Sequence, residues 1–177
     1  MPYELLAQQS SEVRDQQWRL VVEETKAYYK DVPLDSPFHP SNSIHVADVS
    51  YSMKNKVKTV VPIDVSRALA ILMAEVGQRP LYTFSGDAKR YDPVWANLTQ
   101  ALALLKDKNC STNFKGLIDR IYSDCAMTAS LKGRDLSDVV PGSIVIYTDG
   151  GFDQMCHEKP TSAMEYVQKK FAGLTRM

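Results

Sequence analysis

Two short segments of almost unbroken apolar sequence limit the folds that this chain can adopt. IHVADV at residues 44–49 and SIVIYT at residues 143–148 are rich in β-branched side chains and too short for buried helices. PLYTF at residues 80–84 is a third segment of this kind. Strands that are apolar on both faces are typical of parallel sheets covered by helices. The three segments therefore predict neighbouring strands of one mainly parallel sheet.

Helical patterns separate these strands along the chain. Residues 125–142 lack a regular pattern and are expected to be mostly loop, whereas KRYDPVW, at residues 89–95, could add a short edge strand. Asp64 is the expected N-cap of its helix, and Ser162 with Glu165 fits a capping box. The alternation predicts an α/β fold with a doubly wound, Rossmann-like sheet and helices on both faces. The expected helices cover residues 11–30, 64–78, 97–106, 113–124 and a last segment from Thr161 or Ser162.

The length of 177 residues fits one domain of ordinary size. We expect residues 1–40 to form a helix and a Pro- and Ser-rich linker that pack on a domain spanning residues 41–177. The chain reaches Met177 soon after the last expected helix, where a doubly wound sheet would continue into another strand. We therefore expect this sheet to lack its last strand, either because the chain is a fragment or because the sheet is short.

Composition and charge narrow the functional class. The chain carries 21 basic and 21 acidic side chains, so its zero net charge favours neither nucleic acid nor an anionic membrane as a partner. No apolar run resembles a signal peptide or approaches the roughly 18 residues of a membrane span. The three cysteines, Cys110, Cys125 and Cys156, form no CxxC pair. A reducing compartment is the simplest interpretation, with the cytoplasm expected first and the nucleus as the alternative.

Polar side chains follow the apolar strands at the point where each strand ends. Asp48, Ser50 and Ser52 leave the first strand in the order Asp-x-Ser-x-Ser, and Asp149 leaves the last strand. Thr112 precedes a helix between them. Ligands bind at the carboxyl ends of strands in open α/β sheets. Because Mg²⁺ prefers oxygen ligands and keeps several waters, the five side chains predict a site for one Mg²⁺ or Mn²⁺ ion.

The same residues carry a resemblance to a known family. DVSYSM, STNF and IYTDGGFD resemble the metal-ion-dependent adhesion site of von Willebrand A domains, which is Asp-x-Ser-x-Ser, a distant Thr and a later strand-end Asp. The resemblance spans roughly residues 11–172 and is closest to intracellular members. These include the C-terminal domain of an uncharacterised family of plants, fungi and large viruses and, more distantly, the A domain of Ro (TROVE) proteins. It implies a von Willebrand A-like fold and a non-enzymatic module whose Mg²⁺ is completed by an Asp or Glu of an unknown partner protein.

Other interpretations stay open. Asp48 and Thr112 could simply cap local structure, and Tyr51 stands where most such sites have glycine, so its ring could cover the metal or contact the partner. A Ro-like RNA-associated protein is one alternative function, although zero net charge does not favour it. A Mg²⁺-dependent phosphohydrolase using Asp48 is another. Against the phosphohydrolase, Ser50 stands where such an enzyme would carry its second carboxylate. The chain also contains no Walker A, GxSxG or HExxH motif.

Overall fold

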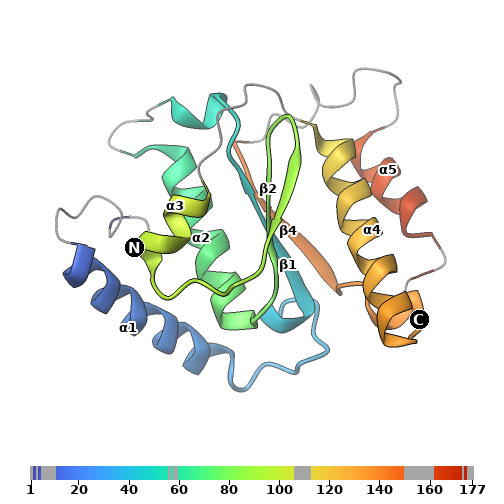
Figure 1. The fold of residues 1–177 in the computed structure, drawn as a ribbon, viewed down its shortest axis with the longest axis horizontal. Coiled ribbons are helices and arrows are strands. Elements are labelled where there is room, and N and C mark those ends of the chain that lie inside the picture. Colours follow the sequence, from blue (N-terminus) through green and yellow to red (C-terminus); the bar gives the residue numbers. More distant parts are fainter. Residues whose placement is uncertain are drawn as a thin grey trace.

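The protein is an α/β structure built on a four-stranded mixed sheet (Figure 1). The computed structural model describes residues 2, 4, 11–55, 57, 60–105, 113–149, 162–172 and 174. Within them the strand order is β3-β2-β1-β4. The strands are β1 (Ser43–Asp48), β2 (Leu81–Phe84), β3 (Ala88–Tyr91) and β4 (Ser143–Tyr147).

Strand pairing confirms the predicted neighbours. β1 pairs in parallel with β2 on one side and with β4 on the other, in registers that set Val46 beside Tyr82 and Ile146. β3 pairs antiparallel with β2 and forms one edge, as the KRYDPVW segment suggested. Since β1, β2 and β4 run in the same direction, their carboxyl ends meet at one edge of the sheet.

One face of the sheet is covered by α2 (Pro62–Gly77). Residues Ala47 and Leu81 of the sheet pack toward this helix, which is in turn covered by α1 (Ser11–Tyr29) and α3 (Leu98–Leu104). Trp18 of α1 is 2% exposed and belongs to the core between these helices. The N-terminal helix therefore packs on the α/β core.

The opposite face is covered by α4 (Phe114–Lys132), with α5 (Ala163–Lys170) packed against it (Figure 1). Ile44, Val46, Tyr82 and Phe84 alternate with the residues that face α2 and form a core with α4. Asp119 of α4 fixes α5, because it accepts hydrogen bonds of 2.6 Å from Tyr166 Oη and Lys170 Nζ. Helices thus lie on both faces of the sheet.

Two local predictions were wrong. α4 continues through residues that we expected to be loop, and it ends at Lys132 before Gly133, whose φ of 59° is left-handed. Asp64 is not an N-cap: α2 begins at Pro62, with Val61 at the N-cap position, and Asp64 lies in the first turn. The Ser162–Glu165 capping box is confirmed at the start of α5.

Three short 3-10 helices complete the described structure: η2 (Pro40–Asn42), η3 (Ser52–Lys54) and η4 (Leu136–Asp138). Ser52, the last residue of the Asp-x-Ser-x-Ser motif, is the first residue of η3. Across the described residues, no helix has both the length and the apolar character that crossing a membrane requires.

Candidate metal centre

Asp48 is the most buried of the predicted metal ligands that the structure describes. It ends β1 at the carboxyl edge of the sheet and is only 1% exposed. Its Oδ1 accepts a 2.9 Å hydrogen bond from the backbone N–H of Ser50, and its Oδ2 accepts a 2.7 Å bond from Thr148 Oγ1. The carboxylate is therefore held in one orientation by both neighbouring chain segments.

The two serines of the motif lie together beside this carboxylate. Ser50 Oγ and Ser52 Oγ are 3.1 Å apart, because η3 turns the chain immediately after β1. Two neighbouring oxygens on an octahedral Mg²⁺, with bonds of about 2.1 Å, lie about 3.0 Å apart. The spacing of the serine hydroxyls therefore fits adjacent positions around one small cation. Ser50 is 2% exposed and Ser52 is exposed, so the pair runs from the interior to the surface.

Asp149 lies at the same edge of the sheet. It is exposed and directly follows Thr148, whose hydroxyl is bonded to Asp48. This hydrogen bond joins the carboxyl end of β4 to that of β1. Asp149 is thus the next residue in the chain after Thr148, whose side chain contacts Asp48.

Thr112 lies outside the described residues, so its place in the site stays a prediction. Its neighbour Asn113 donates a 2.8 Å backbone hydrogen bond to the carbonyl of Ser85, which follows β2. Asn113 also caps α4, since its side chain accepts a hydrogen bond from Gly116 N at 2.8 Å. Asn113, the residue that follows Thr112 in the chain, therefore lies at the edge where Asp48 lies, beside the neighbouring strand.

Tyr51, which stands between the two serines, adopts an ordinary right-handed helical conformation with φ −64°. This position therefore does not require the positive φ that glycine allows. The Tyr51 ring is 59% exposed, and Lys54 Nζ lies 5.5 Å from its centre. An aromatic ring and an ammonium group thus lie on the exposed side of the candidate site.

The charge of Asp48 has no cationic partner among the described side chains. The described ion pairs leave Asp48 out, although it is almost fully buried. Burial of a carboxylate costs free energy unless the charge is hydrogen-bonded and compensated. The described part of the chain also has no cluster of three or more His, Cys, Asp and Glu side chains suited to a metal. A cation here would depend on hydroxyl oxygens as well as carboxylates.

Sequence reasoning missed Thr148 and Ser66 as supporting residues. Thr148 holds Asp48, and Ser66 Oγ of α2 donates a 2.8 Å hydrogen bond to the carbonyl of Tyr147 at the end of β4. The signal for Thr148 is its place directly before Asp149. Its partner, however, follows only from the β1–β4 register, which places Ala47 beside Tyr147 and so brings Asp48 next to Thr148.

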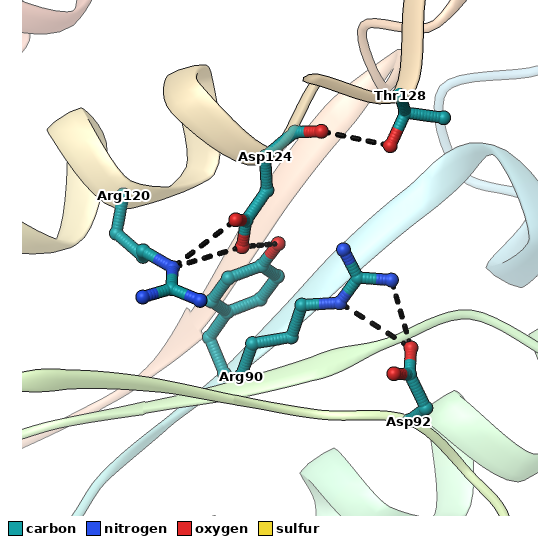
Figure 2. A network of polar contacts seen from close by, with 6 residues as sticks. Arg90, Asp92, Arg120, Asp124 and Thr128 are labelled. Atoms are coloured by element: carbon teal, nitrogen blue, oxygen red, sulfur yellow. Dashed lines mark hydrogen bonds and ion pairs between the residues drawn. The ribbon is translucent and has the colours of Figure 1, made fainter. Parts of the chain in front are cut away.

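A second polar network lies between β2, β3 and α4 (Figure 2). Asp124 is 5% exposed, accepts a 2.9 Å hydrogen bond from Tyr82 Oη, and pairs with Arg120 Nε at 3.1 Å. Arg90 pairs with Asp92 at 2.8 Å. Burial, and then the charge of Asp124, raise the pKa of Tyr82 above its ordinary range, so its hydroxyl stays a donor. The bond from Tyr82 satisfies two buried polar groups and ties α4 to β2, whereas the Arg120 pair lies within α4 and the Arg90 pair lies near the surface.

Comparison with known families assigns the chain to a family whose function is not described. The family described as "Domain of unknown function (DUF7788)" matches residues 42–174, which include the whole sheet, α2 to α5 and all five candidate ligands. Searches of curated proteins and of solved structures find no match. Because the match covers most of the sequence, the chain belongs to the DUF7788 family.

Proposed function

We propose that this protein is a von Willebrand A-like, doubly wound domain that binds one Mg²⁺ ion through Asp48, Ser50, Ser52, Thr112 and Asp149. In this proposal Mn²⁺ can replace Mg²⁺, and an Asp or Glu of a partner protein completes the coordination. The domain is a binding module of the cytoplasm rather than an enzyme. The resemblance of DVSYSM, STNF and IYTDGGFD to adhesion-type metal sites supports the assignment.

The arrangement of Asp48 and the serines carries the proposal. A buried carboxylate without a described cationic partner lies beside two hydroxyl oxygens 3.1 Å apart. A divalent cation would compensate the carboxylate and use both hydroxyls as ligands. Each oxygen of Asp48 accepts one hydrogen bond from the described residues and keeps a lone pair for the ion or for a water bound to it.

Neutral ligands explain why the partner should offer a carboxylate. Three of the five proposed ligands are hydroxyls, so the two aspartates would at most neutralise a divalent ion. An ion with few anionic ligands keeps its affinity for an outside anion. Exposed Ser52 and Asp149 lie on the solvent side of the site, where such a group would approach.

The geometry of Asp48 also favours binding over catalysis. A nucleophilic carboxylate needs an accessible oxygen in line with its substrate. Both oxygens of Asp48 already accept hydrogen bonds, and the side chain is 1% exposed. This arrangement suits a fixed ligand better than an attacking group.

Calorimetric titration with MgCl₂ and MnCl₂ tests the metal site. We expect one ion per chain for the wild type, an affinity lower by at least tenfold in Asp48→Asn, and wild-type affinity in Asp31→Asn, an exposed aspartate of the linker. Asp149→Ala serves as the second variant, since its exposed side chain can change without disturbing the core. Equal affinity of the wild type, Asp48→Asn and Asp149→Ala would contradict the proposal.

A second measurement tests the open coordination position. Acetate added to the Mn²⁺-loaded protein should displace bound water and lower the water-proton relaxation rate. Acetate that leaves the relaxation unchanged would show that no position is open to a carboxylate. Phosphatase turnover with Mg²⁺ that Asp48→Asn abolishes would instead favour an enzyme.

A further inference from the structure

β4 forms an edge of the sheet even though its sequence is that of a buried strand. Within the described residues nothing pairs with its outer side. All five of its residues are only half-buried, among them Ile144, Val145 and Ile146. Exposed apolar edges with unpaired backbone groups readily accept another strand, and proteins normally cover or charge them. β4 carries no charged side chain that would discourage such pairing.

An open groove of about 1540 Å³ runs along β4 on the side of α4 and α5. Ile144 and Ile146 of the strand form part of its lining, opposite apolar residues of the two helices. α5 packs mainly on α4 and leaves this space beside the strand. The groove therefore offers an apolar surface to every second side chain of a strand laid against β4. The apolar residues of this lining include Phe114 and Ile118 of α4, Val167 of α5 and Phe171 at the end of α5.

Basic groups gather at the end of the groove that lies at the amino end of β4. Arg79 precedes β2, and Lys132 and Arg134 lie at the end of α4, so all three are at the amino edge of the parallel strands. Lys132 and Arg134 are exposed, and the buried Nε of Arg79 has no hydrogen-bond partner among the described atoms. Asp35 and Asp138 also line this end, which leaves an excess of one positive charge.

We propose that the outer edge of β4 is a docking site for an extended segment of a partner protein. The segment is about five residues long, as β4 is, with apolar side chains at alternate positions. It runs antiparallel to β4, so that an acidic group at its carboxyl-terminal end lies beside Arg79, Lys132 and Arg134. Main-chain hydrogen bonds supply affinity, and the groove and basic end supply specificity.

Room beside the strand favours a single segment over a second copy of this chain. A two-fold pairing of β4 with its copy would bring a second α5 to the same face of the joined sheet, where the groove already lies under one α5. A single extended segment needs only the unpaired backbone edge of β4 and space in the groove for one row of its own side chains. This docking site is also independent of the proposed metal site, because its charged end lies at the opposite edge of the sheet.

The test uses a fluorescein-labelled peptide, Thr-Val-Thr-Ile-Thr-Val-Glu with a free carboxyl terminus, and the full chain. We expect saturable binding by fluorescence anisotropy that persists in EDTA, and slower hydrogen exchange of the amides of residues 143–147. A peptide with proline at its centre should lose at least tenfold in affinity, because it cannot complete the backbone pairing. Moving the glutamate to the amino end and amidating the carboxyl end should also weaken binding at least fivefold.

Surface variants locate the binding. Met164→Asp changes a groove residue that is 65% exposed and should weaken binding at least fivefold, whereas Met127→Asp, 54% exposed and outside the groove lining, should not. Equal binding by both variants, or unchanged exchange at residues 143–147, would overturn the site. If the peptide with glutamate at its amino end and an amidated carboxyl end bound as tightly as the original peptide, the antiparallel orientation would be overturned. A peptide-free dimer with protected β4 amides would identify a second copy as the occupant instead.

Discussion

At the scale of single residues, His45 shows how burial makes a side chain sensitive to acid. It is 3% exposed on β1, its Nδ1 lies 3.0 Å from Tyr147 Oη, and the two rings stack with centroids 6.0 Å apart. Its Nε2 is buried without a partner among the described atoms. Burial lowers the pKa of His45 from 6.5 to about 4, because the charged form would lose its hydration.

We therefore predict that His45 weakens the fold as the pH falls. Above pH 6.5 the ring is neutral in both the folded and the unfolded state and causes no loss. Between pH 6.5 and about 4 only the unfolded state takes up the proton, so stability falls with pH by at most about 3 kcal/mol. Urea unfolding across this range should show a smaller loss in His45→Phe than in the wild type. Parallel pH profiles for the two proteins would contradict the assignment.

Tyr51 gives a second prediction at this scale. Its backbone is right-handed and its ring lies exposed beside Lys54, so we expect it to contact the partner rather than to hold the metal. Tyr51→Gly should change Mn²⁺ affinity less than threefold and lower the affinity for a carboxylate partner, with acetate as the first probe. Tyr51→Phe is the matched control and should behave as the wild type. Tighter acetate binding by Tyr51→Gly would show instead that the ring covers the ion.

The separate parts of the candidate site differed in how far the sequence could predict them. Asp48, Ser50 and Ser52 are close in the chain, so a strand followed by a tight turn is enough to bring them together. The bond from Thr148 to Asp48 joins residues 100 positions apart. It depends on the register in which β1 and β4 pair, and a register is not written in a local pattern.

At the scale of helices and strands, Glu75 joins three elements. The carboxylate on α2 accepts hydrogen bonds from Trp18 Nε1 of α1 at 3.2 Å and from Trp95 Nε1 before α3 at 2.5 Å. Burial raises the pKa of Glu75, although both indoles and Lys26 oppose the rise. With its folded pKa above the unfolded value, Glu75 stabilises the fold most at acid pH, and this contribution is lost as the pH rises through the folded pKa.

Two substitutions of Glu75 should separate its charge from its hydrogen bonds. Glu75→Gln keeps an acceptor for the indoles and removes the buried charge, so it should be at least as stable as the wild type at pH 7. Glu75→Ala leaves two indole N–H groups without this acceptor and should cost about 2 kcal/mol or more. Chemical unfolding followed by tryptophan fluorescence measures both. An alanine variant as stable as the glutamine variant would show that the indole bonds contribute little.

Helix ends were harder to predict than helices. The second half of α4 carries Ser, Thr and Cys among its residues, and only Cys125 and Ala129 there are buried core positions. Such a sparse apolar face gives a weak periodic signal, so packing on the sheet extends the helix further than its pattern indicates. α2 begins at Pro62 because proline suits the first helical position, which overrides the capping tendency of Asp64.

At the scale of the whole molecule, a few observations were enough to predict that the three apolar strands share one mainly parallel sheet. Apolar segments of five or six residues, separated by helices, allow little besides a parallel sheet covered on two faces. The composition of SIVIY, which is that of a central strand, gives no sign that β4 forms an edge of the sheet. Its half-buried residues follow from the absence of a described neighbour on one side.

Metal binding should also stabilise the whole molecule, because the proposed ligands end or follow β1, follow β4 and, in the case of Thr112, precede α4 in the chain. An ion that binds only the folded chain adds about 1.4 kcal/mol at a concentration ten times its Kd, which raises Tm by roughly 3–6 °C. Exposed Asp149 supports no described side-chain contact, so Asp149→Ala should keep the wild-type Tm in EDTA.

In Mg²⁺, however, Asp149→Ala should lose most of the increase in Tm. Calorimetry of both proteins, with and without Mg²⁺, separates a ligand from a structural residue. A lower Tm in EDTA would assign Asp149 a structural role. If Mg²⁺ raised the Tm of Asp149→Ala as much as that of the wild type, Asp149 would be excluded from the metal site. The same comparison can be made for variants of Asp48 and the two serines.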